Sequence, residues 1–305
     1  MQVAIGPSSF ADQDKTPQKI LEQSGIEVKP NPYGRRLAQN EIIEHLKGAV
    51  GLIAGLEPLN RKVLVSAPQL KAIARVGIGM DNVDQAAAAE LGIKVSNTPD
   101  GPTEAVAEMC LTALLSLKRK LFSFNTELHR GVWQKHIGMG LRDSNVLLVG
   151  YGRIGRRFGE LLRIFKANLW ICDPQLKQSD LAFDERLVTL SEGLKQCDVI
   201  SLHASGREKI LGDAQFAKMK PDTILLNSAR GNLVDEDSLI HALKKEIISA
   251  AWLDVHNHEP YDGPLKNYEQ VLLTPHISTY TRQCRRSMEE SAVRNLLQDL
   301  NIKLK

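Results

Sequence analysis

The sequence predicts an α/β protein with doubly wound parallel sheets, on three observations. Short apolar runs alternate with helical patterns along the whole chain, which is typical of parallel sheets covered by helices on both faces. One of these runs leads through a glycine turn into a helix, over residues 146–165. A break rich in proline and polar residues at 97–102 divides the chain, and its 305 residues suit about two domains.

Composition and charge exclude several classes of protein. The chain is 43% hydrophobic and 25% charged, as ordinary globular proteins are. Its net charge of +3, from 39 basic and 36 acidic residues, is too balanced to indicate a nucleic-acid or membrane partner. No run reaches the ~20 apolar residues of a membrane span, and the N-terminus does not resemble a secretory signal. The cysteines form no CxxC pair, so we expect reduced thiols and a cytoplasmic protein; they are Cys110, Cys172, Cys197 and Cys284.

The first 97 residues alternate strand and helix signals. Thr16 followed by Pro17 starts a helix, and Gly25 ends it. Strands are expected at 2–5, 26–28, 50–54, 70–76 and 93–96, and further helices at 40–46 and 81–91. This alternation predicts an α/β unit of its own.

The stretch 97–102, NTPDGP, is the clearest break in the chain. Its prolines and glycine can continue neither a helix nor a strand, which predicts a linker or hinge. A helical pattern follows over 105–121, with apolar residues Val106, Met109, Cys110, Ala113, Leu114, Leu117 and Leu121. Such a stripe serves either core packing or a subunit interface, and its spacing does not choose between them. Trp133 is expected to pack at a domain or subunit contact.

The stretch 146–155, VLLVGYGRIG, predicts a dinucleotide site. A buried strand leads into a turn in which Gly150 allows the tight bend and Gly152 lets the backbone approach a pyrophosphate. Gly155 lets the following helix pack closely on the strand, and the positive end of that helix attracts the pyrophosphate. After a second strand at 168–172 comes Asp173, 23 residues after Gly150, near the ~20-residue offset of an acid that holds the ribose. We therefore expect a Rossmann-type domain that binds NAD.

The remaining elements continue the same rhythm. Strands are expected at 199–202, 223–227, 248–253 and 271–274, and helices at 213–218, 235–244 and 284–300. In an open α/β sheet, ligands bind beyond the carboxyl ends of the strands. Arg230, Asp254 and His276 each follow one of these strands, and Glu259 lies five residues beyond Asp254.

Three of these residues suffice for hydride transfer to a 2-keto acid. The guanidinium of Arg230 can hold a carboxylate and the adjacent carbonyl oxygen. A protonated His276 can supply the proton that the alkoxide needs. A carboxylate behind it, Glu259, fixes its tautomer and stabilises its cationic form. Arg230 alone would be interpreted as a surface cation and His276 alone as a loop histidine; together with the glycine turn they indicate a site.

A metal site is the alternative interpretation of 253–260, LDVHNHEP. His256 and His258 flank Asn257 there, but no third ligand stands at a recognisable spacing. A catalytic zinc normally needs three protein ligands, so we expect no metal.

The motifs GYGRIG, Asp173, NSARGNLVDE at 227–236, LDVHNHEP and LLTPHIS at 272–278 resemble, in order and spacing, the D-isomer-specific 2-hydroxyacid dehydrogenase family. LKAIARVGIGMDNVD at 70–84 and AVAE at 105–108 are similar to further signatures of that family, so the resemblance covers nearly the whole chain. It points to the short, phosphoglycerate-dehydrogenase-like members that lack a regulatory domain.

The resemblance implies an architecture and a set of roles. Two Rossmann-like lobes would enclose a cleft, with 1–97 plus 283–305 as the substrate-binding domain and 98–282 as the NAD-binding domain. Family members are usually homodimers built on the helix after the first hinge. Arg230, Glu259 and His276 would be catalytic, and Arg75, Gly77, Ile78, Gly79 and Arg230 would contact the substrate. The cofactor would contact Gly150, Gly152, Arg153, Ile154, Gly155, Asp173, His203, Ala229, Arg230, Asp254 and His276.

Some positions depart from the family's pattern. Many phosphoglycerate enzymes carry an arginine after the third strand, where this chain has AGLE at 54–57. Ser278 and Thr279 replace small residues, often glycine, after the histidine, and 204–207 replaces a Pro-Leu-Thr turn. The first departure argues against phosphoglycerate, although Arg75 could still meet an anionic tail.

The expected activity is NAD-dependent interconversion of a small 2-keto acid and the D-2-hydroxy acid. A glyoxylate or hydroxypyruvate reductase is the alternative within the family. The alternative without enzymatic activity is an NAD-sensing binding protein, similar to the corepressors that resemble this family. Formate-dehydrogenase-like chemistry is disfavoured, because that branch pairs its histidine with glutamine where this chain has Glu259.

Overall fold

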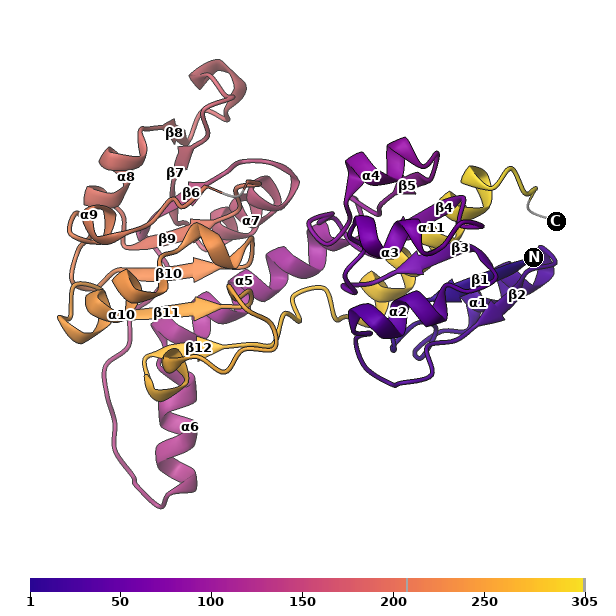
Figure 1. Ribbon diagram of the computed structural model, residues 1–305. Helices are drawn as coiled ribbons and strands as arrows, with labels where there is room; N and C mark the ends of the chain where they lie inside the picture. Colours follow the sequence, from indigo (N-terminus) through magenta and orange to yellow (C-terminus); the bar gives the residue numbers. More distant parts are fainter. Residues whose placement is uncertain (207, 304–305) are drawn as a thin grey trace. The chain divides into compact units, whose positions relative to one another are not determined.

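The computed structural model describes residues 1–206 and 208–303, and these form two compact units (Figure 1). Unit 1 comprises Met1–Pro102 and Tyr280–Lys305, and unit 2 comprises Thr103–Thr279. The boundaries predicted from the sequence, 97/98 and 282/283, differ from these by a few residues. The expected linker ends early because Pro102 is the first residue of a helix, where the fixed φ and missing N–H of proline are tolerated. Arg207, in the unusual turn at 204–207, lies outside the described residues.

Unit 1 is built on a five-stranded parallel sheet in the order β2-β1-β3-β4-β5. The strands are β1 (Gln2–Ile5), β2 (Glu27–Lys29), β3 (Ala49–Ala54), β4 (Ala72–Arg75) and β5 (Lys94–Ser96). The strand order reverses between β1 and β3, so the loops after these two strands diverge to opposite faces. Such a switch point is where doubly wound sheets bind ligands.

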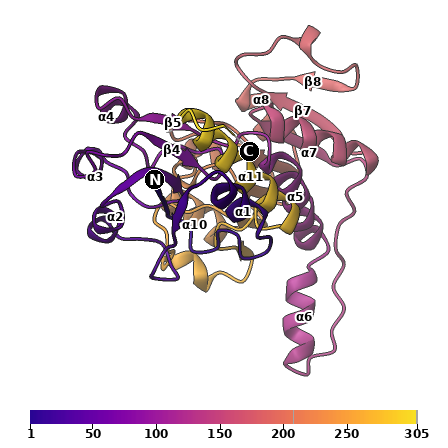
Figure 2. The ribbon, with the colours of Figure 1, turned by 90° about the vertical axis from the view of Figure 1, so that its right-hand side faces the viewer.

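Helices cover both faces of this sheet. They are α1 (Thr16–Gln23), α2 (Gln39–His45), α3 (Arg61–Val65), α4 (Gln85–Glu90) and α11 (Arg282–Asp299). The side chains of α2, α3 and α4 share one apolar cluster with Leu52 and Ile73 of the sheet. On the other face α1 packs beside α11, and α11 packs on β3 and β4, as Figures 1 and 2 both show. The last helix therefore returns to the N-terminal unit.

Unit 2 is built on a seven-stranded parallel sheet in the order β12-β11-β10-β9-β6-β7-β8. The strands are β6 (Asn145–Val149), β7 (Asn168–Cys172), β8 (Glu185–Leu187), β9 (Val199–Leu202), β10 (Ile224–Asn227), β11 (Ala250–Leu253) and β12 (Val271–Leu273). The two parallel sheets confirm the predicted α/β class. The order of this second sheet reverses between β6 and β9, which places its switch point beside the glycine turn that follows β6.

The side chains of β6 show how the two faces of this sheet are buried. Leu147 and Val149 join a cluster with helices α8 (Leu190–Gln196), α9 (Asp213–Phe216) and α10 (Glu236–Lys244). Val146 and Leu148 point the other way and pack with α5 (Pro102–Lys118) and α7 (Arg153–Ile164). The alternation follows from the two-residue period of a strand, and it explains why a strand buried on both faces is apolar throughout. Short 3-10 helices lie at Gln178–Asp180, Gly231–Leu233 and Pro264–Asn267.

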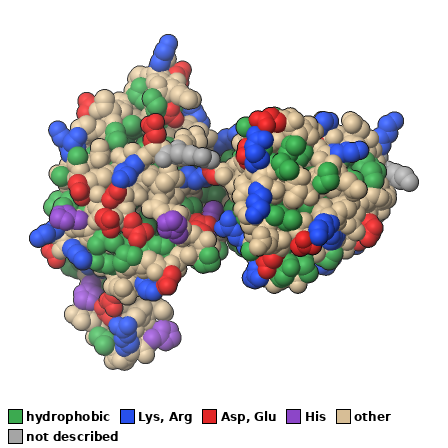
Figure 3. Space-filling view, in the orientation of Figure 1, with side chains coloured by type: hydrophobic (Ala, Val, Ile, Leu, Met, Phe, Trp, Pro, Cys, Tyr) green, Lys and Arg blue, Asp and Glu red, His purple; other side chains and the backbone are tan. Residues whose placement is uncertain are grey.

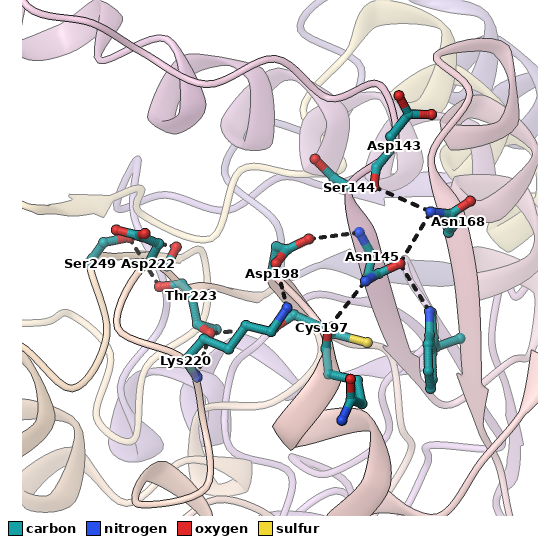
Figure 4. Close-up of polar contacts among 12 residues, drawn as sticks. Asp143, Ser144, Asn145, Asn168, Cys197, Asp198, Lys220, Asp222, Thr223 and Ser249 are labelled. Carbon is teal, nitrogen blue, oxygen red and sulfur yellow. Dashed lines mark hydrogen bonds and ion pairs between the residues drawn. The ribbon is translucent and has the colours of Figure 1, made fainter.

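The amino ends of these strands are joined by polar contacts (Figure 4). The carboxylate of Asp198 accepts a hydrogen bond from the backbone N–H of Asn145 at 2.8 Å and pairs with Lys220 at 2.9 Å. The side-chain amide oxygen of Asn145 accepts from Asn168 and Trp170. These contacts connect the amino ends of β6, β7 and β9, whereas the glycine turn lies at the carboxyl end of β6. The amino ends of these strands therefore have a structural role.

The helix expected over 105–121 is two helices. Lys120 has a left-handed backbone, with φ of 51°, and separates α5 from α6 (Leu121–His129). Leu121 therefore belongs to the second helix, where it is exposed, rather than to the stripe of the first. Val106, Cys110, Ala113 and Leu114 are buried in the core of unit 2, which supports the core-packing interpretation for that part of the stripe. Among the described residues, no helix combines the length and apolarity needed to cross a bilayer.

Candidate active site

The glycine turn of unit 2 has the backbone geometry of a pyrophosphate cradle. Gly150 directly follows β6 with φ of 90°, a region that residues with a Cβ rarely adopt. A Cβ added to Gly150 would lie 2.6 Å from the backbone nitrogen of Ala204, in the loop after β9. A Cβ added to Gly155 would overlap the carbonyl oxygen of Gly150, so helix α7 begins directly against the turn. No atom of the described residues lies within 4 Å of a Cβ built on Gly152, so the backbone there is open to a ligand.

Helix α7 directs its positive end at this turn. Gly152 is its N-cap, and Arg153 and Ile154 are its first residues. The first N–H groups of a helix lack intrahelical partners, and these groups attract an anion. The residues therefore fit the diphosphate of a dinucleotide at the switch point of the sheet.

Asp173 lies beside the same turn. Its Oδ2 accepts a hydrogen bond from the backbone N–H of Tyr151 at 2.8 Å, and its Oδ1 accepts from Gln175 at 3.0 Å. These bonds hold the carboxylate at the end of β7, next to the turn. This position is the one expected for an acid that binds the adenosine ribose.

The side chain of His203 is partly buried and packs against Phe158. Its Nε2 lies 2.9 Å from Ser201 Oγ, and its ring centroid is 5.6 Å from that of Phe158. Burial lowers the pKa of His203 to about 4, so the imidazole is neutral at physiological pH. The expected contact of His203 with the cofactor remains a prediction, and its ring has a structural partner of its own.

His276 and Glu259 are in direct contact. His276 follows β12 and has a left-handed backbone with φ of 56°. Its Nδ1 lies 3.1 Å and 3.0 Å from the two carboxylate oxygens of Glu259. Because Nδ1 faces the carboxylate, Nε2 is the nitrogen that can face a substrate. Both side chains are partly exposed, at 36% and 25%, so the pair is accessible.

The charge state of Glu259 follows from its neighbours. Burial by itself would raise the pKa of Glu259, but the hydrogen bond and charge of His276 and the backbone N–H of His256 outweigh burial. The pKa of this carboxyl therefore lies below its ordinary value. Glu259 is ionised near neutral pH and favours the protonated form of the imidazole.

Asp254 holds the loop that carries His276. It follows β11, is fully buried and accepts hydrogen bonds from the backbone N–H groups of Ile277 and Ser278, both at 2.9 Å. The hydroxyl of Thr274 donates to it at 2.6 Å. The resemblance implies only that Asp254 contacts the cofactor, and this second role in positioning the loop is visible in the structure alone. A polar residue at the end of a buried strand is the sequence signal that marks both Asp254 and Thr274.

The loop of Arg230 packs against the loop of Glu259. A Cβ added to Gly231 would overlap the backbone of His256 and Asn257, so the two loops approach as closely as their backbones allow. Nη1 of Arg230 donates to the carbonyl oxygen of Ala229 at 2.7 Å. The buried side chain of Asn227 donates to the carbonyl oxygen of Arg230 and accepts from the N–H of Ala229. Asn227 therefore shapes this loop, a role that was not predicted from the sequence.

The other expected substrate contacts belong to unit 1. Arg75 is the last residue of β4, and Gly77, Ile78 and Gly79 form the loop that follows. A Cβ added to Gly77 would overlap the guanidinium of Arg75, so the arginine lies across this glycine. The N–H of Gly77 donates to Thr98 Oγ1 at 2.8 Å, which fixes the loop.

The two histidines of the alternative metal interpretation have other surroundings. His256 Nε2 lies 3.0 Å from the carbonyl oxygen of Thr274, and its ring stacks on Tyr261 at 4.5 Å. His258 is exposed. Within residues 1–206 and 208–303, no group of three or more potential ligands could hold a metal ion.

These features define an α/β protein with a dinucleotide cradle and a carboxylate–histidine pair at the carboxyl edge of one sheet. Residues 111–278 match the family described as D-isomer specific 2-hydroxyacid dehydrogenase, NAD binding domain. The chain belongs to the D-isomer-specific 2-hydroxyacid dehydrogenase family, and its cofactor is NAD, as the resemblance implies.

Relatives and solved structures agree with this family. A D-3-phosphoglycerate dehydrogenase of Methanocaldococcus jannaschii is 35% identical over 279 residues, 88% of this chain and 52% of that protein. A glyoxylate reductase of Pyrococcus furiosus is 31% identical over 293 residues, 91% of this chain and 87% of that protein. The crystal structure of the TT0316 protein from Thermus thermophilus superposes with a TM-score of 0.91 at 33% identity, over 99% of this chain and 97% of that one. This chain thus spans about half the length of that phosphoglycerate dehydrogenase.

The contact between Glu259 and His276 predicts a shift in pH dependence. In the catalytic role expected from the sequence, His276 must be protonated for reduction of a keto acid, and an ionised Glu259 favours that form. Glu259→Gln keeps the shape of the side chain and removes its charge. His276 should then lose its proton at lower pH, so the alkaline limb of the kcat/KM profile for reduction should shift to lower pH. Oxidation of the hydroxy acid would need the neutral imidazole. As pH falls, the variant should therefore lose less of this activity, relative to the parent, than it loses of the reduction.

Profiles of kcat/KM against pH in both directions, for parent and variant, test this expectation. Glu269→Gln removes the same charge from an exposed site in unit 2, where the carboxylate lies 3.8 Å from Arg130, and should leave the profile in place. An unshifted alkaline limb in Glu259→Gln would remove the carboxylate from the relay.

Proposed function

We propose that the protein reduces a small 2-keto acid to the D-2-hydroxy acid with NADH, and catalyses the reverse reaction. The observation that carries this proposal is the contact between His276 Nδ1 and Glu259, at the same edge of the sheet as the glycine turn. A bound NADH would supply the hydride. Family membership supports the general reaction, and relatives named glyoxylate reductase make unphosphorylated keto acids the first substrates to test.

Each of four residues would have a separate role in the reaction. Arg230 would hold the substrate carboxylate and the keto oxygen, which orients the carbonyl and stabilises the charge that develops on it. His276 would donate the proton on Nε2 to that oxygen as the hydride arrives. Glu259 would stabilise the imidazolium before the transfer and keep Nδ1 in place after it. Asp254 would fix the loop from which His276 acts.

Replacement of the proton donor tests the proposal. His276→Gln should lower kcat for the best keto acid by about 10²–10⁴-fold, because the general acid acts in the transition state, while NADH affinity should hardly change. The measurement is NADH oxidation with glyoxylate, hydroxypyruvate, pyruvate and 3-phosphohydroxypyruvate, together with NADH binding by fluorescence. His258→Gln, at an exposed histidine of the same loop region, is the matched control.

Two outcomes would contradict the assignment. Turnover of His276→Gln within a few-fold of the parent would mean that another group gives the proton. NADH binding without turnover of any keto acid by the parent would favour the nucleotide-sensing alternative.

We further propose that NADH is preferred over NADPH, because the carboxylate of Asp173 would repel a 2′-phosphate. The sequence after it, Pro174-Gln175-Leu176, contains no arginine to bind that phosphate, and Lys177 is the nearest cation along the chain. The test is the ratio of kcat/KM for the two cofactors. Asp173→Ala should reduce the preference for NADH over NADPH. A parent that prefers NADPH would show that Asp173 does not select the cofactor.

We also propose that the protein is a homodimer in which α6 contacts a second copy. No residue of α6 is buried, and it carries exposed Leu121, Phe122 and Leu128. The segment after it exposes Trp133 at 80% and Ile137 at 95%, and Figures 1 and 2 both show α6 projecting from the sheet of unit 2. Figure 3 shows hydrophobic side chains among histidine and charged ones on this surface. An apolar surface of this kind marks an interaction site.

Light scattering should give a mass of two chains. Phe122→Glu should shift the equilibrium towards one chain, because it places a charge among apolar contacts. A monomeric parent at micromolar concentration would contradict the homodimer.

The four free thiols, Cys110, Cys172, Cys197 and Cys284, support the proposal that the protein works in the reducing cytoplasm.

A further inference from the structure

The carbonyl oxygen of Thr274, directly after β12, contacts both loops that carry the carboxylate–histidine pair. The backbone N–H of His276 donates to this oxygen at 3.0 Å. Nε2 of His256, in the loop after β11, lies 3.0 Å from the same oxygen. A carbonyl oxygen can only accept a hydrogen bond, so Nε2 of His256 carries a proton and donates it. One oxygen atom therefore receives a hydrogen bond from each of the two loops.

His256 is also bonded to Glu259 through its backbone. Its N–H donates to Oε1 of Glu259 at 3.2 Å, and the same oxygen lies 3.1 Å from Nδ1 of His276. Strands β11 and β12, which these loops follow, are neighbours in the sheet. His256 is thus joined to the carboxylate by its main chain and to the turn of His276 by its side chain.

The ring of His256 is itself held in place. It is partly buried and stacks on Tyr261, with ring centroids 4.5 Å apart and an angle of 25° between the planes. The hydroxyl of Tyr261 accepts a hydrogen bond from the backbone N–H of Leu265 at 3.1 Å. Burial raises the pKa of Tyr261 to about 12, so this neighbour carries no charge near neutral pH. Stacking on one face and the bond at Nε2 together fix the orientation of the imidazole.

We propose that His256 is a positioning residue, which holds the loops after β11 and β12 together so that Nδ1 of His276 stays against Glu259. A left-handed backbone at a residue other than glycine, as at His276, persists only where its surroundings hold it. Asp254 secures the two residues after His276, and His256 secures the carbonyl of Thr274 before it. The inference rests on the proposed function, because it concerns the same proton donor.

Two variants isolate the hydrogen bond from His256. His256→Phe keeps a ring to stack on Tyr261 and removes the N–H. His256→Gln removes the ring and keeps an N–H donor, separated from Cα by the same number of bonds. In His256→Phe the contact between His276 and Glu259 should loosen. The alkaline limb of kcat/KM for reduction of the best keto acid should then shift to lower pH by up to about one unit, which corresponds to the free energy of about one hydrogen bond.

His256→Gln should restore the limb towards its position in the parent. NADH binding, followed by fluorescence, should be unchanged in both variants, because the glycine turn follows β6 and does not contain these contacts. Any charge of His256 itself is absent from both variants, so the comparison between them does not depend on that charge. This comparison therefore reports on the hydrogen bond.

Two further measurements separate positioning from a general loss of structure. In a Glu259→Gln background, His256→Phe should no longer shift the limb, because the charge that His256 keeps against His276 is absent. His258→Phe removes an exposed imidazole two residues further along the chain and should leave the profile in place. A merely structural role of His256 would produce neither the dependence on Glu259 nor the rescue by Gln.

The outcomes distinguish the inference from the function on which it rests. His256→Phe that binds NADH and keeps the parent profile overturns the inference, and so does an equal shift in His256→Gln. If His256→Phe fails to bind NADH, His256→Met replaces it, since Met has the length of Gln without the donor, and the same two results decide. An unshifted limb in Glu259→Gln overturns the relay and this inference with it. A parent that reduces no keto acid overturns the proposed function itself.

Discussion

The buried carboxylate of Asp254 is the constraint on which the candidate active site depends. A buried carboxylate must be satisfied by donors, and the loop after β12 supplies three of them. Hydrogen bonds to a charged group contribute about 1.5–3 kcal/mol each. A non-glycine residue with a left-handed backbone costs about 1–3 kcal/mol, so these bonds can hold His276 in that conformation. Its contact with Glu259 then follows from the same loop geometry.

Much of the fold is predictable because its signals are local. The strands at 2–5, 168–172 and 199–202 are found at the predicted bounds, since each is a short apolar run between turn signals. The break at Lys120 is not predictable, because a left-handed lysine leaves no mark in the sequence. Strand β8 and helix α8 are too short and too polar to show a period. Residue types and strand ends suggest His276 and Glu259, whereas the role of Asp254 depends on contacts twenty and more residues away.

The sheets of both units have a switch point, but the crevices at these two points differ. In unit 2, the switch point presents open backbone at Gly152 and the positive end of α7, so an anion can bind there. In unit 1, the switch point is filled by the chain's own carboxylate at Glu57. Sheets of the same kind therefore present one crevice that is open to an anion and one that a side chain of the protein itself fills.

Helix α11 belongs to unit 1 but follows unit 2 in the chain, so unit 1 can be completed only after unit 2 has been translated. The five strands of unit 1 leave the ribosome before unit 2, but the helix that covers β3 and β4 follows only after all of unit 2. Leu296 of that helix packs against Gly51 of β3, so the part of this face over β3 and β4 remains uncovered while unit 2, which is continuous in the chain, can fold. The nascent protein must therefore carry exposed apolar surface on β3 and β4 while unit 2 is translated, and during this interval that surface is open to aggregation and to chaperones.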